Sequence, residues 1–156
     1  MTRNSERMTK GDWVEVCGDK LRELGIANFT PLEICDVGRV AADKVTLQAP
    51  SLDLLSNAVM LLEVLSWLRQ QEVVAPILIN SFYRDSEYNK AIGGVAASMH
   101  TTCGAADIVK IGYSPNQVAD MLELHPLSEL FGIGRYNTFT HVDVRGMIGR
   151  TSPARW

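Results

Sequence analysis

The sequence predicts an α+β fold in which helices flank a small antiparallel sheet, and three observations lead to this expectation. The chain has 156 residues, of which 46% are hydrophobic, enough for one buried core and short for two. One long segment carries apolar residues at helical spacing, and three short apolar runs are typical of strands. These strands and helices do not alternate strictly, which favours an antiparallel sheet. We therefore expect a single domain over residues 1–156.

The first third of the chain is expected to hold one short helix and a long loop. Residues 1–10 are polar and are expected to fray. Apolar residues between Trp13 and Leu24 fit an amphipathic helix, with Gly25 just beyond its end as a C-cap. Residues 26–49 are mixed and contain a proline and a glycine, so we expect a loop with at most one short helix.

The clearest helix is expected to begin after Ser51 and to reach about Arg69. Ser51 suits the N-cap, and Asp53 adds a negative charge to the first turn. The apolar side chains then recur at the spacing of a helix that faces a core. They are Leu54, Leu55, Ala58, Val59, Leu61, Leu62, Leu65 and Leu68.

Strands are expected mainly in the second half of the chain. Three short, apolar segments are typical of strands: residues 76–81, 105–109 and 139–144. Residues 86–92 suit a helical turn, and residues 115–124 suit a helix with a proline at its first position. Residues 132–134 read GIG and are expected to form a turn or bulge. His125 would end the second of these helices, where a cation complements the helix dipole.

Composition excludes several classes of function. A formal charge of −3 and a pI near 5.6 provide no basic surface, so we expect no nucleic-acid partner. No apolar stretch is long enough to cross a bilayer, and the polar N-terminus does not read as a secretory signal, so we expect no membrane partner. Three cysteines without CxxC spacing argue against a disulfide framework. A monomer is expected because no apolar heptad pattern occurs.

Two histidines and an aspartate are the strongest candidate site. His100 precedes Asp107 by seven residues, and His141 follows Asp107 by 34. Two imidazoles and one carboxylate suit one Zn²⁺ and leave a fourth position for water or substrate. On the strand expected at 139–144, His141, Asp143 and Arg145 would share one face. A single histidine–aspartate pair is more often structural, so the hypothesis depends on the three residues together.

Four motifs follow one another in the second part of the chain, within residues 50–156. Residues 81–89 read SFYRDSEYN, and residues 98–107 read SMHTTCGAAD, which is similar to SxHxxGxAxD with its glycine displaced by one position. Residues 132–136 read GIGRY, and residues 139–146 read FTHVDVRG. In this order the motifs resemble the family of zinc D-Ala-D-Ala carboxypeptidases and L-alanyl-D-glutamate endopeptidases, whose fold the hedgehog signalling domains resemble.

The resemblance implies a cell-wall hydrolase that cuts a peptide bond in peptidoglycan peptides. The ligands it implies for one zinc ion are His100, Asp107 and His141. Arg84 resembles the family's arginine that steadies the substrate carbonyl or carboxylate, and its alternative role is an ion pair with Asp85 or Glu87. Tyr83 and Ser98 are expected to line the site. The small size and the absence of a signal resemble phage endolysins, which stay in the cytoplasm until they are released to the wall.

The general base that takes a proton from water is less clear in the sequence. Relatives often carry an acidic residue three positions before the last histidine, where this chain has Thr138. Asp143 is the nearest acidic candidate, and orienting a ligand is its alternative role. Asp85 or Glu87 could also be brought in by the fold. Because of Thr138, a catalytically inactive zinc- or wall-binding module, such as a phage tail component, is the alternative function.

Overall fold

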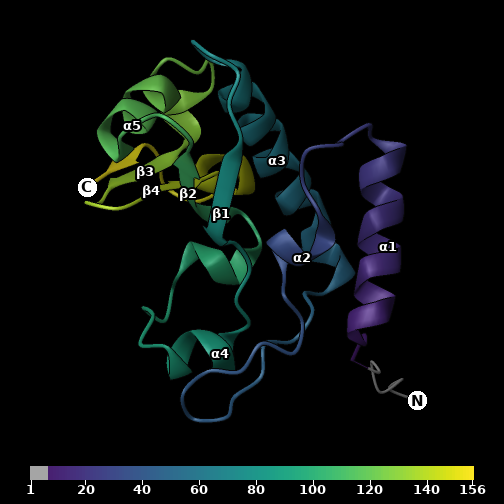
Figure 1. Ribbon diagram of the computed structural model, residues 1–156. Coiled ribbons are helices and arrows are strands. Elements are labelled where there is room, and N and C mark those ends of the chain that lie inside the picture. The colour runs from purple at the N-terminus through teal and green to yellow at the C-terminus, as the bar shows by residue number, and fades with distance from the viewer. Residues whose placement is uncertain (1–6) are drawn as a thin grey trace.

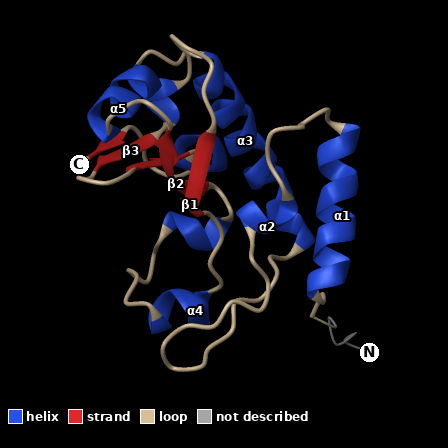
Figure 2. Cartoon of the chain, viewed as in Figure 1, coloured by secondary structure: helices blue, strands red, loops and turns tan. Residues whose placement is uncertain are grey.

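The computed structural model describes residues 7–156 and confirms the mixed fold, with helices around a five-stranded sheet (Figures 1 and 2). The strands are β1 (Ile77–Ser81), β2 (Ala105–Lys110), β3 (Gly132–Arg135), β4 (Thr140–Asp143) and β5 (Ala154–Arg155). Their order in the sheet is β1-β2-β4-β3-β5. The first three pairings in this order are antiparallel, whereas β5 runs parallel to β3. The sheet is therefore antiparallel except at its last pair.

The first helix, α1 (Lys10–Glu23), begins with a complete capping box. The Asp12 N–H donates to Thr9 Oγ1, and the Thr9 N–H donates to the Asp12 carboxylate, so two otherwise unpaired amides are satisfied. Gly25 follows the helix with φ +70°, as expected of a C-cap glycine. Lys10 was expected to fray but belongs to the helix; the rest of that expectation falls partly on residues 1–6, which lie outside the described residues.

The expected loop at 26–49 contains one short helix, α2 (Pro31–Ile34), and an isolated bridge between Val40 and Thr46. Two hydrogen bonds connect this segment to the residues that follow β1. The Tyr83 N–H donates to the Ile34 carbonyl, and the Gln48 N–H donates to the Asp85 carboxylate. In Figure 1, α1 lies far from the last strands of the sheet, with α2 and α3 between them.

The central helix is α3 (Leu55–Gln70), preceded by a 3-10 turn that Ser51 caps as expected. Its side chains Leu61, Leu62, Leu65 and Leu68 are completely buried and form the middle of the core. Lys110, at the end of β2, is also completely buried, and its ammonium group donates to the Leu68 and Gln71 carbonyls. A cation thus closes the C-terminal end of α3, where the carbonyls lack partners within the helix.

Two further helices complete the fold, α4 (Ser86–Ala91) and α5 (Pro115–Glu123). Asp85 caps α4, and Ser114 opens α5 with a capping box. His125 lies beyond α5 and does not act as a helix-end cation. The Leu127 N–H donates to its Nδ1 at 3.0 Å, and its ring packs on Trp67, so the ring is neutral. Burial lowers its pKa in agreement with this.

The GIG segment was expected to be a turn, but it is strand β3. Its glycines are required by close neighbours: a Cβ at Gly132 would lie 2.4 Å from the Asp143 carboxylate, and one at Gly134 would lie 2.7 Å from the Trp156 indole. No strand was expected after residue 144, but Ala154–Arg155 forms β5. In both places tertiary contacts override the local sequence pattern.

The three cysteines are free thiols and all are buried. Burial raises the pKa of Cys17 and of Cys35 to about 12, so neither forms a reactive thiolate near neutral pH. Across the described residues there is no helix that is both long and apolar enough to cross a membrane.

Candidate metal centre

Three elements bring the candidate ligands together. His100 lies on a 3-10 helix (Met99–Thr102) that Ser98 caps through its hydroxyl group. Asp107 lies on β2 and His141 lies on β4, where the antiparallel register places them directly opposite each other. Residues 34 positions apart in the chain are therefore neighbours because the two strands pair.

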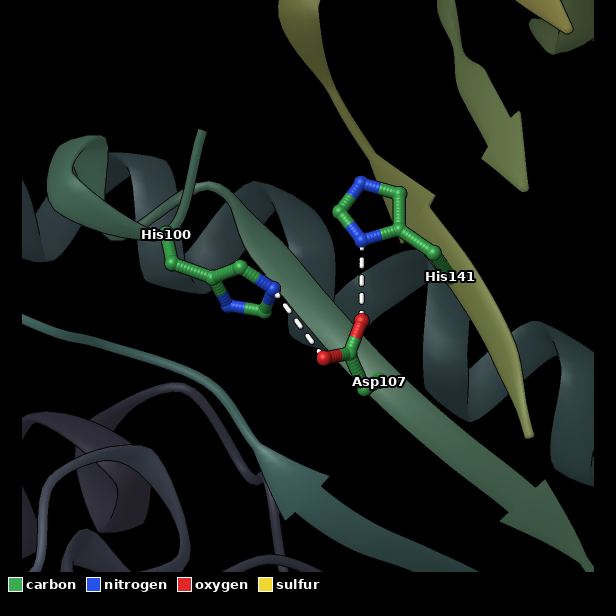
Figure 3. A group of neighbouring side chains, drawn as sticks. All are labelled: His100, Asp107 and His141. Carbon is green, nitrogen blue, oxygen red and sulfur yellow. Dashed lines mark hydrogen bonds and ion pairs between the residues drawn. The ribbon is translucent and has the colours of Figure 1, made fainter. Parts of the chain in front are cut away.

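The Asp107 carboxylate lies between the two imidazoles (Figure 3). His141 Nδ1 is 2.9 Å from Asp107 Oδ1, and His100 Nε2 is 3.3 Å from Asp107 Oδ2. One potential ligand atom from each residue lies within 4.8 Å of those of the other two. Two nitrogens and one oxygen converge in the way that a tetrahedral zinc site with an open fourth position requires.

Each imidazole is fixed by a contact on its other nitrogen. His100 Nδ1 is 2.6 Å from the Phe82 carbonyl oxygen, which only accepts, so Nδ1 carries the proton and Nε2 is left to bind a metal. His141 Nε2 is 2.8 Å from Asp143 Oδ2 and donates to it, so Nδ1 faces Asp107. Such contacts behind the ligands set the tautomer and the ring orientation of metal-binding histidines. The residues present therefore fit a zinc ion.

The charges of the cluster support the same interpretation. Burial would raise the pKa of the Asp107 carboxyl, but hydrogen bonds from His100 and His141 outweigh it and hold that pKa below its usual range. Burial would lower the pKa of His141, but Asp107 and Asp143 outweigh it and raise that pKa. Asp107 thus keeps its negative charge between the two rings, as a carboxylate that binds a cation must.

Asp143 is completely buried behind His141. The Arg145 guanidinium binds both of its oxygens, at 2.8 and 2.7 Å, and the Gly132 N–H donates to Oδ1. Burial would raise the pKa of the Asp143 carboxyl, but the bonds from Arg145 and His141 hold it below its usual range. Asp143 contacts the ring nitrogen opposite to the one that faces Asp107, so the geometry favours its orienting role over that of a base.

Arg84 reaches the cluster from the segment between β1 and α4. Its Nη2 is 3.5 Å from Asp107 Oδ2, and its Nε donates to Ser81 Oγ at 3.0 Å. Asp85, the alternative partner in the sequence, instead caps α4. The Arg84 side chain is 18% exposed, and its guanidinium has donors left for a ligand that enters beside Asp107.

A hollow of about 330 Å³ opens over the three ligands. Its wall contains Arg84 and Ser98, as expected, whereas Tyr83 lines a different hollow of about 580 Å³. Arg84 borders both hollows. The other lining residues are Val95, Ala97, Met99, Tyr136, Phe139, Arg145 and Trp156.

Thr138, at the position where relatives often carry an acidic residue, does not line this hollow. Thr138 is exposed in the turn before β4, and Glu87 is exposed on α4. Among the described residues that line the hollow, Asp107 is the only carboxylate. The structure thus brings together the three ligands, Arg84 and Ser98, and it leaves the place of the general base without a carboxylate.

Comparison with known proteins agrees with this geometry. The sequence profile of the family described as Peptidase M15 matches residues 27–143, well over half of the chain. The chain belongs to the Peptidase M15 family. Peptidases of this family are zinc-dependent metallopeptidases, and all three ligands lie within the matched residues. A search among curated proteins found no match.

The M15 motif also explains a strained residue. In SxHxxGxAxD a glycine stands three positions after the histidine, and here that position is Cys103. Cys103 adopts a left-handed conformation with φ +62°, which glycine adopts without cost and other residues do not. The displaced glycine, Gly104, begins the approach to β2. The motif's spacing therefore reflects a backbone turn that brings His100 back toward Asp107.

Two residues of this M15 site gave no usable signal in the sequence. Trp156 and Tyr136 line the hollow, and the Trp156 indole N–H donates to the Tyr136 hydroxyl group at 2.7 Å. Trp156 is 15 residues beyond His141, in a segment without hydrophobic periodicity. Only its aromatic character in a polar segment set it apart.

Proposed function

We propose that this M15 peptidase is a zinc-dependent hydrolase of bacterial peptidoglycan that cuts a peptide bond in the stem peptide or cross-bridge. The observation that carries the proposal is the convergence of His100 Nε2, Asp107 and His141 Nδ1, with both rings held in the ligating tautomer. The peptidoglycan substrate is supported by the four motifs that resemble wall peptidases. The same resemblance supports an endolysin-like protein that stays in the cytoplasm until it is released to the wall.

A zinc ion held by these residues supplies Lewis acidity, which polarises a carbonyl oxygen and makes water nucleophilic near neutral pH. The protein's own task is to place the substrate. Arg84 lines the hollow beside Asp107, where a guanidinium suits a peptide carbonyl or a terminal carboxylate. Ser98 holds the 3-10 helix of His100 and lines the same hollow.

In this proposal Asp143 orients His141 rather than taking the proton of the attacking water. Its two oxygens are already occupied by Arg145 and by His141. Changing Asp143 to Asn should therefore weaken zinc binding by about 10- to 100-fold, as is typical of groups behind a ligand. A base that does not touch the metal would instead lower kcat and leave zinc affinity unchanged.

A catalytically inactive zinc- or wall-binding module is the second candidate, because one observation favours it. The hollow has no carboxylate among its described lining residues besides the ligand Asp107, and Thr138 is exposed. This candidate and the hydrolase share the zinc site and the wall as ligand. They differ in whether peptide bonds are cut, which a direct assay decides.

The experiment is turbidity loss of outer-membrane-permeabilised Gram-negative cells with purified protein. We expect lysis that a chelator abolishes and added Zn²⁺ restores, and we expect none with His141→Ala. His125→Ala is the matched control, because His125 lies outside the site, and it should lyse normally. Mass spectrometry of the released fragments then distinguishes carboxypeptidase from endopeptidase cleavage. Bound zinc without any cleavage of purified peptidoglycan would favour the inactive module.

The remaining expectations about partners belong to the same proposal. We propose a monomer that needs neither nucleic acid nor a membrane to act. Light scattering at several protein concentrations checks the first part, and a concentration-dependent mass would contradict it.

A further inference from the structure

The segment after β4 builds one wall of the metal hollow, although it lies beyond residues 27–143 that match the family. Strand β5 pairs in parallel with β3 and is held at its end by two backbone bonds. The Trp156 N–H donates to the Ile133 carbonyl at 3.2 Å, and the Arg135 N–H donates to the Trp156 carbonyl at 2.8 Å. The position of Trp156 is therefore set by the sheet and not by a loose tail.

The Trp156 indole packs against one metal ligand, His141, and against Arg145, which holds the partner of that ligand. Its ring lies 5.2 Å from the His141 ring, measured between centroids, and the Arg145 guanidinium lies over it at 5.2 Å. Arg145 in turn binds Asp143, and His141 Nε2 donates a hydrogen bond to Asp143. These four side chains form a closed ring of contacts, in which the indole restrains both ends of the Arg145–Asp143–His141 chain.

We propose that Trp156 is a positioning residue for the metal ligand His141, and that its half-exposed ring forms the wall of the hollow beside the metal. This inference rests on the proposed zinc site. Trp156 is 48% exposed as a residue, so it is not held in place by burial in the core, and its indole N–H is bonded to the Tyr136 hydroxyl group. Its contacts instead limit the rotation of the His141 ring about its side-chain bonds.

Gly134 makes room for this arrangement. It lies opposite His141 in the β3–β4 register, and a Cβ added there would be 2.7 Å from the indole and 2.9 Å from the Tyr136 ring. Such a contact is too short for either ring to stay in place. Gly134→Ala therefore displaces Trp156 without removing any side chain that contacts the ligands.

The test compares zinc affinity, measured by competition with a chromogenic chelator, in the wild type, Trp156→Phe and Trp156→Ala. We expect Trp156→Ala to bind zinc about tenfold more weakly, the low end of the range for groups behind a ligand. Trp156→Phe keeps a ring against His141 and should stay close to the wild type. Gly134→Ala should weaken binding in the same direction as Trp156→Ala, which guards against a folding defect specific to one variant.

A second measurement reads the position of the indole without any activity. Paramagnetic Co²⁺ added to the metal-free protein should quench the emission of Trp156, because its ring lies against a ligand. The chain has three tryptophans, and Trp67 also packs on a histidine, His125, outside the site. Trp67→Phe is therefore the matched control and should keep the quenching, whereas Trp156→Phe should lose most of it.

The outcomes separate this inference from the function on which it rests. If the wild type binds neither zinc nor Co²⁺, both the proposed function and the role of Trp156 are overturned. If the wild type binds zinc and both Trp156→Ala and Gly134→Ala bind it equally well, only the role of Trp156 is overturned. Weaker binding in both variants, with Trp156→Phe near the wild type, supports the inference.

Discussion

Asp107 and Lys110 lie three residues apart on β2, and both are charged and buried, yet their surroundings differ. Lys110 is completely buried, and its protons go to the Leu68 and Gln71 carbonyls at the end of α3. Asp107 keeps a 12% exposed side chain, and its oxygens face the ring nitrogens of two histidines. One charge completes the backbone of a helix, and the other sits among groups that can exchange a proton for a metal.

The difference shows how a functional charge can be told from a structural one in this fold. The partners of Lys110 are carbonyl oxygens, which can only accept hydrogen bonds from it. The partners of Asp107 are imidazoles whose remaining nitrogens are fixed by Phe82 and Asp143, as a metal site requires. A buried charge with replaceable partners beside a hollow is the candidate for function.

Removing the negative charge of Asp107 should have the largest effect. Asp107→Asn removes the negative ligand, and we expect the peptidase activity to fall at least about 10³-fold with loss of tight zinc binding. Activity against purified peptidoglycan and chelator competition check this, with the exposed Asp19→Asn as control. Retained zinc affinity in Asp107→Asn would contradict the ligand assignment.

Removing the ammonium group of Lys110 should instead lower the stability of the fold and leave zinc affinity unchanged. Lys110→Met keeps the length of the side chain but leaves the Gln71 carbonyl without its Lys110 donor, while the Leu68 carbonyl still accepts from the Gln71 N–H. We expect a loss of about 1–3 kcal/mol in unfolding free energy, the cost of one buried unpaired group. Urea denaturation measures it, and Lys90→Met on the exposed face of α4 is the control. The zinc affinity of Lys110→Met should match the wild type; a drop would show that the two charges are coupled.

The sequence predicted the elements whose pattern is local and missed those that depend on distant contacts. Helix α3 was predictable because its apolar residues recur every three or four positions. The ligands were predictable because three residues of types that bind zinc occur in motifs with known spacing. Strand β3 was missed because its glycines resemble a turn, although Asp143 and Trp156 are what require them. The role of Trp156 was missed because only the folded sheet brings it to His141.

A third prediction concerns the turn that leads from His100 to β2. Cys103 has φ +62°, where a left-handed residue other than glycine costs roughly 1–2 kcal/mol. We therefore expect Cys103→Gly to be more stable than Cys103→Ala by about 1 kcal/mol, since both lose the same thiol. At Cys17, inside α1, the order should be reversed, because alanine favours helix over glycine by about 1 kcal/mol. Thermal unfolding of the four variants tests this, and alanine more stable than glycine at both positions would exclude strain at Cys103.

The smallest expected effect concerns His125, the histidine outside the site, and the pH dependence of the unfolding free energy. His125 has a lowered pKa, so its neutral form favours the folded state above pH 6.5, and that contribution is lost as the pH falls toward the folded-state pKa. The wild type should therefore lose slightly more unfolding free energy between pH 7.5 and 5.0 than His125→Asn, whose amide oxygen can still accept from Leu127. Urea denaturation at the two pH values measures the difference. An equal loss in both proteins would mean that His125 does not titrate in this range.

The ligands of the candidate centre come from a 3-10 turn and two strands that are far apart in the chain, so the unfolded polypeptide has no such centre. A cation that binds only the folded chain stabilises it by mass action, by about 2.7 kcal/mol at a free concentration one hundred times the dissociation constant. Zinc supply would then control the abundance of the protein as well as its chemistry. Chains made under zinc starvation would unfold more often, and cellular proteases would remove them sooner.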